Sequence, residues 1–411
     1  MMSRARLLSL ALIAGAVLFP GTAAAQGAVG SGPLTSTLTE TEPTSGILNL
    51  GSLKLAPGIT INQIGVDSNV FNQANDPKED FIASVKPDLA AFLRLRFMQV
   101  SAYGGGDFSY FRTYDTENSA GYAGRARVDF LFSRFFPFVG FGETKTRERA
   151  GSEIDVRANN VLREQSGGVG YRWSETGALY LSVVNTKTKY EAAFEDGVDL
   201  SQSLNRYSED FGAGLRTALS PLTTLTLRAG YQQDIFQALP ARNSNRRYLS
   251  GVFSFAPQAT FTGSATVGYL DFRPADPKVE PFRGLTASLA LSYPILEIIR
   301  INAIYSRSLE YSFDVSEAYY LSNRYSLALT QRILGAVDAQ VVGSRTFSNY
   351  GQRETAPPRT DSHDVLNGSL GYNLRNRTRI ALNYEYSRRK SLIALNNFEG
   401  RRIYLSWTYA F

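Results

Sequence analysis

The strongest constraint in this sequence is a regular alternation of short turns and long polar loops between segments of strand length. Short turns of two to four residues fall at 96–98, 134–136, 175–177, 221–223, 258–260, 296–297, 334–336 and 376–377. Longer connections alternate with them at 72–79, 113–120, 151–161, 192–205, 238–245, 275–282, 314–318, 352–361 and 392–398. Eight turns and nine loops make seventeen connections, which predicts eighteen strands. Soluble β-sandwiches lack this regularity of loop length.

Within the strand segments, apolar and polar side chains alternate with period two, as in strands that present two different faces. In the segment 378–389, Ile380 and Leu382 share one face, whereas Arg379 and Asn383 share the other. An apolar outside and a polar inside describe a membrane barrel with a wet lumen. Closure also leaves no unpaired strand edge in lipid. We therefore predict an all-β fold, a transmembrane antiparallel β-barrel of about eighteen strands, or sixteen if one hairpin is miscounted.

Two segments break the apolar pattern on the predicted outer face. Lys187 and Lys189 follow the outward positions that begin at Leu179, and Arg307 lies in phase with Tyr305. We expect these strands to project beyond the bilayer on the extracellular side, where the alternation is no longer required.

The final segment, 401–411, ends the chain on an aromatic residue, Phe411. Every second residue from Ile403 to Phe411 is apolar or aromatic, while the other face is small or polar. This pattern resembles the terminal strand of bacterial outer-membrane barrels, whose C-terminal Phe is read by the barrel-insertion machinery. Phe411 is therefore the predicted assembly signal. An even strand number places both termini on one side, here the periplasm, and the long loops outside.

The N-terminus has the features of a cleaved secretory signal peptide. Arg4 and Arg6 precede an apolar run at 7–19, and Ala23–Ala25 supplies small residues for cleavage. The run is shorter than the roughly 20 residues of a spanning helix. The domain prediction is a signal peptide at 1–25, a flexible periplasmic segment at 26–57 and a barrel in the outer membrane of a Gram-negative bacterium at 58–411.

Composition agrees with an exported barrel and argues against several other classes of protein. The chain has 35 Gly, 23 Tyr and 25 Phe but no Cys, which excludes disulfides and lipoprotein acylation. A single His and no Cys offer no metal-ligand cluster, so neither a metal nor a cofactor is expected. The net charge of +6 falls to +4 when Arg4 and Arg6 are removed (6 − 2 = 4), too mild to indicate nucleic acid.

Projecting the alternation inward gives a lumen of mixed charge. Its predicted basic residues are Arg127, Arg172, Arg216, Arg228, Arg300, Arg324, Arg332, Arg375, Arg379 and Arg402. Its predicted acids are Asp88, Asp129, Asp210, Asp234, Glu310, Asp338 and Glu385. Ten arginines against seven acids favour anions slightly in the lumen. Tyr103, Tyr180 and Tyr404 are also predicted to face the lumen, where their rings could stack on sugar rings. The alternative, which we favour, is a cross-strand ladder of opposite charges that solvates the lumen.

Catalytic residues are not expected. The only histidine, His363, lies beside Ser362 and Asp364 at the end of a predicted extracellular loop. Adjacent strand residues point to opposite faces, so these three residues form no triad in space.

Short motifs mark the first hairpin. The top of its first strand carries Asp67, Asn69, Val70 and Phe71 (D-x-N-V-F), and its second strand carries Asp80 and Pro87. The hairpin resembles the opening of the "Putative beta-barrel porin 2" family, and the general pattern continues to Phe411. The resemblance implies an outer-membrane barrel associated with exopolysaccharide or capsule export. Polysaccharide and periplasmic export components would then be partners, besides membrane lipid. Asp67 and Asn69 are expected to bond nearby backbone at the strand-to-loop bend.

The leading hypothesis is a non-enzymatic barrel that exports exopolysaccharide or passes polar or anionic material. The alternatives are a general diffusion porin for small solutes and a closed structural barrel whose loops mediate surface contacts. A porin would gain from a long loop folding inward as a constriction. The longest predicted loop, 192–205, has only fourteen residues, which weakens that interpretation.

Overall fold

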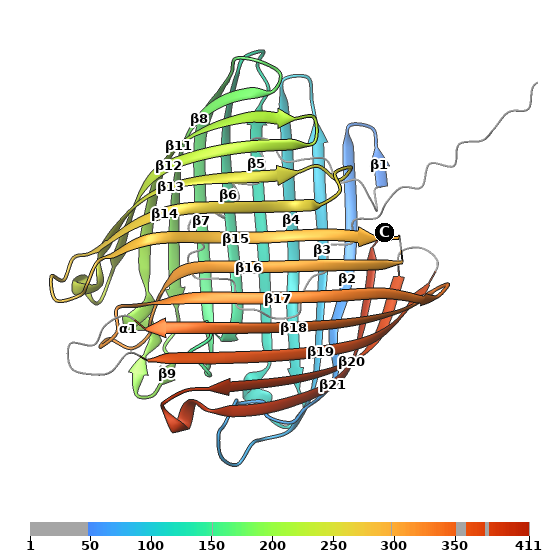
Figure 1. Ribbon diagram of the computed structural model, residues 1–411, viewed down its shortest axis with the longest axis vertical. Coiled ribbons are helices and arrows are strands. Elements are labelled where there is room, and N and C mark those ends of the chain that lie inside the picture. The colour runs from blue at the N-terminus through green and yellow to red at the C-terminus, as the bar shows by residue number, and fades with distance from the viewer. Residues whose placement is uncertain (1–47, 150, 297, 351–358, 375–377, 411) are drawn as a thin grey trace, which may run out of the picture.

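The computed structural model describes residues 48–149, 151–296, 298–350, 359–374 and 378–410. Within these ranges the chain forms a closed antiparallel barrel of eighteen strands, seven from β2 to β8 and eleven from β11 to β21 (Figure 1). The predicted fold and strand number are confirmed. The sheet closes where β21 pairs with β2, from Gly58↔Ala410 to Asp67↔Arg402. In Figure 1 the strands of the near wall run across those of the far wall, because strands of a closed barrel are tilted.

The barrel strands have similar lengths and follow one another in order around the wall. The first seven are β2 (Leu53–Asp67), β3 (Asp80–Arg94), β4 (Met98–Phe111), β5 (Ser119–Phe130), β6 (Phe135–Arg149), β7 (Arg157–Arg172) and β8 (Gly177–Tyr190). The next six are β11 (Arg206–Ser220), β12 (Thr223–Phe236), β13 (Ser244–Phe255), β14 (Thr262–Pro274), β15 (Phe282–Ile295) and β16 (Ile299–Tyr311). The last five are β17 (Tyr319–Leu334), β18 (Val337–Tyr350), β19 (Thr360–Leu374), β20 (Thr378–Lys390) and β21 (Phe398–Ala410).

Small elements lie mainly in the long loops. The β8–β11 connection holds β9 (Phe194–Glu195), β10 (Val198–Asp199) and the helix α1 (Leu200–Leu204), and three other loops hold single 3₁₀ turns, Asp115–Glu117, Pro240–Arg242 and Ala394–Asn396. Among the described residues no helix is long and apolar enough to cross a membrane. The rim with these connections is called the long-loop end below, and the rim with the tight turns is called the short-turn end.

The first barrel strand begins earlier than predicted. β2 starts at Leu53, which pairs with Leu93 of β3, and β1 (Leu48–Leu50) folds back on β2. The prediction of a flexible segment was therefore wrong for 48–57. The apolar alternation in this stretch is too short to predict a strand, but its backbone pairs with β3 and is ordered by that pairing. Pro57 precedes the first residue that pairs with β21, so its missing N–H removes no bond on that side.

Several predictions concern residues outside the described ranges. These are the signal peptide at 1–25, most of the segment 26–57, the lumen residue Arg375 and the assembly signal Phe411. They remain predictions.

The outer wall of the barrel is apolar, as the alternation predicted. Leu249, Leu285 and Leu382 are exposed by 60%, 61% and 53%, a state that only lipid makes favourable for so many large side chains. Exposed aromatic residues border this surface at both ends. Those at the short-turn end are Phe97, Phe132, Phe135, Trp173 and Phe261, and those toward the long-loop end include Tyr110, Tyr122, Tyr207, Tyr269, Tyr325 and Tyr384.

On the inner wall, aromatic rings lie flat over glycines of the neighbouring strand. A Cβ on Gly170 would stand 1.9 Å from the ring of Phe136, and one on Gly214 would stand 2.1 Å from the ring of Tyr180. Each glycine is the register partner of its aromatic residue. The rings thus pack against the wall instead of filling the lumen, which explains part of the high glycine content.

Candidate functional site

Four of the ten predicted lumen cations form ion pairs with predicted lumen acids. Arg127 binds Asp129 at 2.7 Å, Arg379 binds Asp338 at 2.6 Å, Arg402 binds Asp67 at 2.8 Å and Glu385 at 3.3 Å, and Arg228 binds Asp210. The pair Arg379–Asp338 reaches from β20 over β19 to β18. Arg127 and Asp129 lie on the same strand, β5, whereas the other pairs join different strands. The set matches a ladder of paired charges better than a continuous track of unpaired cations.

Aromatic rings support several of the same arginines. The guanidinium carbon of Arg127 lies 4.2 Å from the ring centre of Phe138, that of Arg228 lies 5.2 Å from Tyr248, and that of Arg172 lies 5.3 Å from Phe136. Tyr180 and Tyr404 are each 5% exposed, and the Tyr404 hydroxyl accepts a bond from Asn367. The lumen wall is therefore lined by flat rings with cationic groups beside them.

The remaining predicted lumen residues do not join one cluster. Arg216 stands opposite Ala178 near the short-turn end, Arg300 opposite Thr330, and Arg332 opposite Asp338. Arg324 and Glu310 attract each other near the long-loop end, and Asp88 stands opposite Gly58. The structure thus distributes the predicted set around the wall.

Sequence projection missed the most buried cation of the barrel. Arg246 of β13 is 2% exposed, and its Nε lies 3.0 Å from a carboxylate oxygen of Asp234. Its guanidinium carbon also lies 4.8 Å from the ring centre of Tyr311. The signal was available, because Arg246 is in phase with inward-facing Ser250 and out of phase with outward-facing Leu249.

At the long-loop end, the tip of the β16–β17 hairpin bends into the barrel. β16 pairs with β15 only as far as Arg307, but it pairs with β17 as far as Tyr311. The Tyr311 hydroxyl donates to Asp234 at 2.7 Å, and its ring packs edge-on against Phe236 at 4.9 Å. The tip therefore contacts the inner face of β12 and no longer forms part of the barrel wall.

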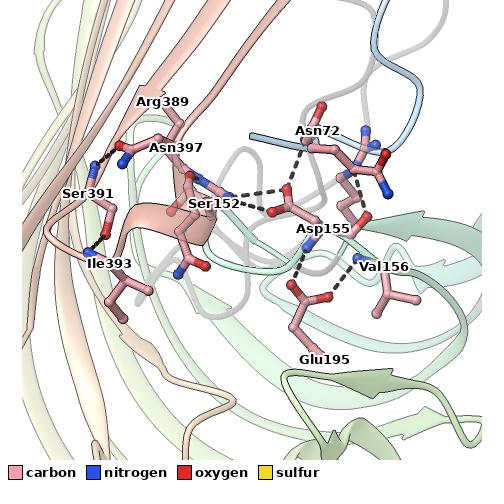
Figure 2. A network of polar contacts seen from close by, with 12 residues as sticks. Asn72, Ser152, Asp155, Val156, Glu195, Arg389, Ser391, Ile393 and Asn397 are labelled. Carbon is pink, nitrogen blue, oxygen red and sulfur yellow. Dashed lines mark hydrogen bonds and ion pairs between the residues drawn. The ribbon is translucent and has the colours of Figure 1, made fainter. Parts of the chain in front are cut away.

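The β6–β7 connection reaches across the same opening to the opposite wall (Figure 2). Asp155 accepts a bond of 3.1 Å from Nη1 of Arg389 on β20, and Oγ of Ser152 lies 2.9 Å from Oγ of Ser348 on β18. Glu195 of β9 accepts from the backbone N–H of Asp155 at 3.1 Å. Walls that are distant in barrel order are thereby connected by one short loop.

The two inward elements meet at Glu153. Its carboxylate accepts bonds from the N–H of Phe313 at 2.7 Å and from the hydroxyl of Ser312 at 3.1 Å. Ile154 packs beside it with Leu200, Leu204 and Phe313 in a buried cluster. We call residues 151–156, the tip 308–318 and α1 the loop plug. Burial raises the pKa of Glu153 to about 7, against the bonds and nearby arginines that favour its charged form.

Comparison with protein families gives a match over nearly the whole barrel. Residues 44–411 match the family described as "Putative beta-barrel porin 2". The chain belongs to this family. It is accordingly a porin-like outer-membrane β-barrel, as the first hairpin indicated. No curated protein sequence matches the chain.

Solved structures with a similar barrel share little sequence with this family member. A BenF-like porin from Pseudomonas fluorescens is 11% identical to this chain, with a TM-score of 0.49. The match covers 87% of this chain and 99% of the porin. OccAB4 from Acinetobacter baumannii is 10% identical, with a TM-score of 0.49, covering 88% and 99%. The siderophore receptor PirA from Pseudomonas aeruginosa is 11% identical, with a TM-score of 0.41, covering 87% and 80%.

The first-hairpin motif fixes the loops around the plug. The backbone N–H of Asn69 donates to Asp67 at 2.9 Å, as predicted, and its side-chain amide donates to the Glu399 carbonyl at 2.9 Å. Asp80 accepts from the Thr113 N–H at 3.0 Å. Val70 is buried, and its carbonyl accepts a hydrogen bond of 3.0 Å from Arg157. The ring of Phe71 packs edge-on against that of Tyr114, with 4.9 Å between the ring centres. Pro87 of β3 stands opposite Ile59 of β2. The motif is structural here.

The histidine does not lie in a loop, contrary to the prediction. His363 belongs to β19, opposite Arg389, and its ring centre lies 5.6 Å from that of Phe398. Asp364 points to the outer wall, where it binds Arg345 and Arg388. Strand pairing with β18 extends the sheet past the predicted loop boundary. Across the described ranges, no group of three or more His, Cys, Asp or Glu could hold a metal.

Proposed function

We propose that this protein is a non-enzymatic outer-membrane channel whose long-loop end is held shut by the loop plug. Its cargo is polar or anionic material, with exopolysaccharide moving outward as the leading candidate. Both chain termini face the periplasm, so the plug closes the extracellular end. One observation carries the proposal: the β6–β7 loop crosses the lumen and binds the far wall through Asp155 and Arg389.

The plug is suited to open because polar contacts hold it to the far wall. Arg389 donates to both carboxylate oxygens of Asp155 and to the carbonyl of Ser152, and the Ser152 hydroxyl meets that of Ser348. Water can replace the hydroxyl contact at a net cost of about 1 kcal/mol, and each bond between the charged groups at about 1.5–3 kcal/mol. The plug can therefore separate from the wall while the strands stay paired.

The lumen wall is suited to a hydrated saccharide. The half-buried ring of Tyr103 offers a surface for a sugar ring, and the guanidinium carbon of exposed Arg125 lies 5.3 Å from its centre. Guanidinium groups bind carboxylates and hydroxyl groups through several N–H donors. The ladder of paired charges keeps the remaining surface polar, so a polymer would slide without binding tightly at one point.

Conductance in planar bilayers tests the channel. The purified barrel should be mostly silent, whereas Arg389→Gln should spend a larger fraction of time open because the anchor of Asp155 is lost. Arg345→Gln is the control, since it removes an arginine–aspartate pair on the outer wall. A barrel that conducts ions in neither variant sinks the channel proposal.

Cargo requires a separate measurement in the source bacterium. Deletion of the gene should reduce surface exopolysaccharide, and the intact gene should restore it. Unchanged surface polysaccharide would refute the export role and leave the channel proposal to the bilayer result.

A general diffusion porin is the second candidate, favoured by the inward-folded loops. Such a porin would pass small solutes at a constriction formed by the plug instead of being sealed by it. Vesicle swelling separates the two candidates: rapid entry of small neutral sugars into vesicles containing the unmodified barrel favours the diffusion porin.

A further inference from the structure

The outer wall changes character near the long-loop end. Outward-facing tyrosines mark a level on the strands. On the short-turn side of this level the outward positions carry large, exposed apolar side chains. On the long-loop side they carry charged side chains, most of them basic. On β14, for example, Tyr269 is followed at the next two outward positions by Asp271 and Arg273. On β16, Tyr305 is followed by Arg307, one of the residues that broke the sequence pattern.

One group of cations lies on β6, β7 and β8 and is called the first basic cluster. Glu143, Arg163 and Lys187 stand side by side on three neighbouring strands. Two residues nearer the long-loop end, Lys145 and Lys189 stand on either side of Val161. The side chain of Arg163 is 56% exposed, and Nζ of Lys187 lies 4.8 Å from the ring centre of Tyr207. Four cations and one acid give these five residues a net charge of +3 (4 − 1 = 3), and the exposed acids Glu209 and Glu191 border them.

A second basic cluster lies on β13, β14 and β15. Arg247, Asp271 and Arg283 stand in one row, and Arg273 projects two residues farther along β14. Asp271 binds Arg273 at 2.6 Å and Arg283 at 3.2 Å, while these two side chains remain 48% and 60% exposed. Three cations share one acid, so the net charge is +2 (3 − 1 = 2).

Both clusters stand directly above surface that faces lipid. In the first cluster, Phe141 precedes Glu143 on the same face of β6 and is 49% exposed; in the second, Leu249 and Leu285 follow Arg247 and Arg283 on the same faces of β13 and β15 and are 60% and 61% exposed. At the opposite rim the outward-facing side chains that border the apolar wall are aromatic, such as Phe97 and Trp173, and the exposed cations Arg96 and Arg134 lie in the turns. The exposed parts of the cations therefore lie at headgroup depth in one leaflet, where anionic headgroups rather than free solvent surround them.

We propose that these two clusters bind the phosphate groups of a phosphorylated glycolipid in the outer leaflet. This inference rests on the proposed orientation, with the long loops outside. A glycolipid that carries more than one phosphate on its sugars matches surfaces of net charge +3 and +2 better than a lipid with a single phosphate. Exposed hydroxyl groups of its sugars would meet the tyrosines that border each cluster, Tyr207 and Tyr269.

The test measures binding of the purified full-length barrel in neutral detergent to bisphosphorylated lipid A by native mass spectrometry. Arg163→Gln/Lys187→Gln and Arg273→Gln/Arg283→Gln should each weaken binding roughly 30-fold, at about 1 kcal/mol for each cation removed near an anionic surface. The control is Arg96→Gln/Arg134→Gln, which removes two exposed cations from turns at the opposite rim and should leave binding unchanged. Heat-modifiable mobility on gels verifies that each variant is folded.

Two further ligands decide between lipid sources. Dephosphorylated lipid A should bind weakly, and phosphatidylglycerol should bind weakly and equally to all variants. Equal binding of lipid A with and without phosphates overturns the proposal, as does phosphatidylglycerol that matches lipid A. Unaltered lipid A affinity in both cluster variants also overturns it. A barrel that stays silent in Arg389→Gln as well would contradict the proposed function alone, because the clusters lie on the outer wall and take no part in conduction.

Discussion

The arginines of the inner and outer walls of this barrel use the same side chain in opposite ways. On the inner wall Arg246 is 2% exposed, its charge is matched by Asp234, and an aromatic ring lies beside it. On the outer wall near the long-loop end, Arg283 is 60% exposed and shares its acid, Asp271, with Arg273. Inner arginines are therefore parts of the wall, whereas outer arginines keep binding capacity for something outside the protein.

This difference follows from the surroundings of each wall. A buried guanidinium must find a carboxylate and ring faces nearby, because an unpaired buried charge is costly. An exposed guanidinium is solvated and gains little from an ion pair. Sequence position alone does not distinguish the two, but phase within the strand does. Substitutions that remove one arginine from each wall measure the difference directly.

The largest effect is expected for Arg246→Met. The change leaves the carboxylate of Asp234 buried without its ion-pair partner, so the free energy of unfolding should fall by about 3–5 kcal/mol. Urea-induced unfolding in lipid vesicles, followed by tryptophan fluorescence, gives the value. Arg283→Met on the outer wall is the matched control and should cost under about 1 kcal/mol. Equal losses in the two variants would show that the inner pairing has no special energetic role.

The loop plug should respond to pH through Glu153. Burial raises its pKa in the closed plug to about 7 from an ordinary value of 4.5, so closure takes up a proton between these values. The closed plug is therefore favoured at pH 5 and loses up to about 3 kcal/mol as the pH rises to 7, above which the effect levels off. Open probability in planar bilayers should rise over this range in the unmodified protein.

Glu153→Gln provides the control for this pH response. Glutamine keeps the acceptor for the Phe313 N–H but has no proton to exchange, so its open probability should be flat between pH 5 and 7. An equally steep rise in Glu153→Gln would assign the response to another group.

The walls of the barrel could be predicted from the sequence because strand alternation is local. The outward positions Leu382 and Leu366 and the inward pairs Arg127–Asp129 and Arg402–Glu385 all follow from phase. Phase also exposed Arg307 as an exception, although the excess of outer cations became visible only when neighbouring strands were placed in register.

The plug could not be predicted, because it depends on contacts that exist only after closure. Asp155 and Arg389 are separated by 234 residues, and nothing in the composition of 151–156 marks that loop as different. Loop length was also the wrong criterion for an inward constriction. A short connection crosses the lumen because the β16–β17 hairpin bends to meet it at Phe313.

The glycine pairing of the inner wall should show an intermediate effect. Gly170→Ala places a Cβ 1.9 Å from the Phe136 ring, so the ring must leave the wall, at about 1–3 kcal/mol. Gly343→Ala on β18 is the control, because that Cβ would meet nothing within 4 Å. Urea unfolding gives the stability, and smaller single-channel currents in an opened variant would report a ring displaced into the lumen. Equal stability of the two variants would mean that the ring has free space to move.

The smallest effect is expected for the ion pairs of the outer wall. Arg345→Gln removes one of two arginines that bind Asp364, and its side chain is 55% exposed. Stability should change by under about 1 kcal/mol, and the change should vanish at high salt because exposed charges are screened. Unfolding measured at low and high ionic strength checks both statements. A loss as large as that of Arg246→Met would mean that the outer charges also hold the wall together, which would leave no surplus for a lipid partner.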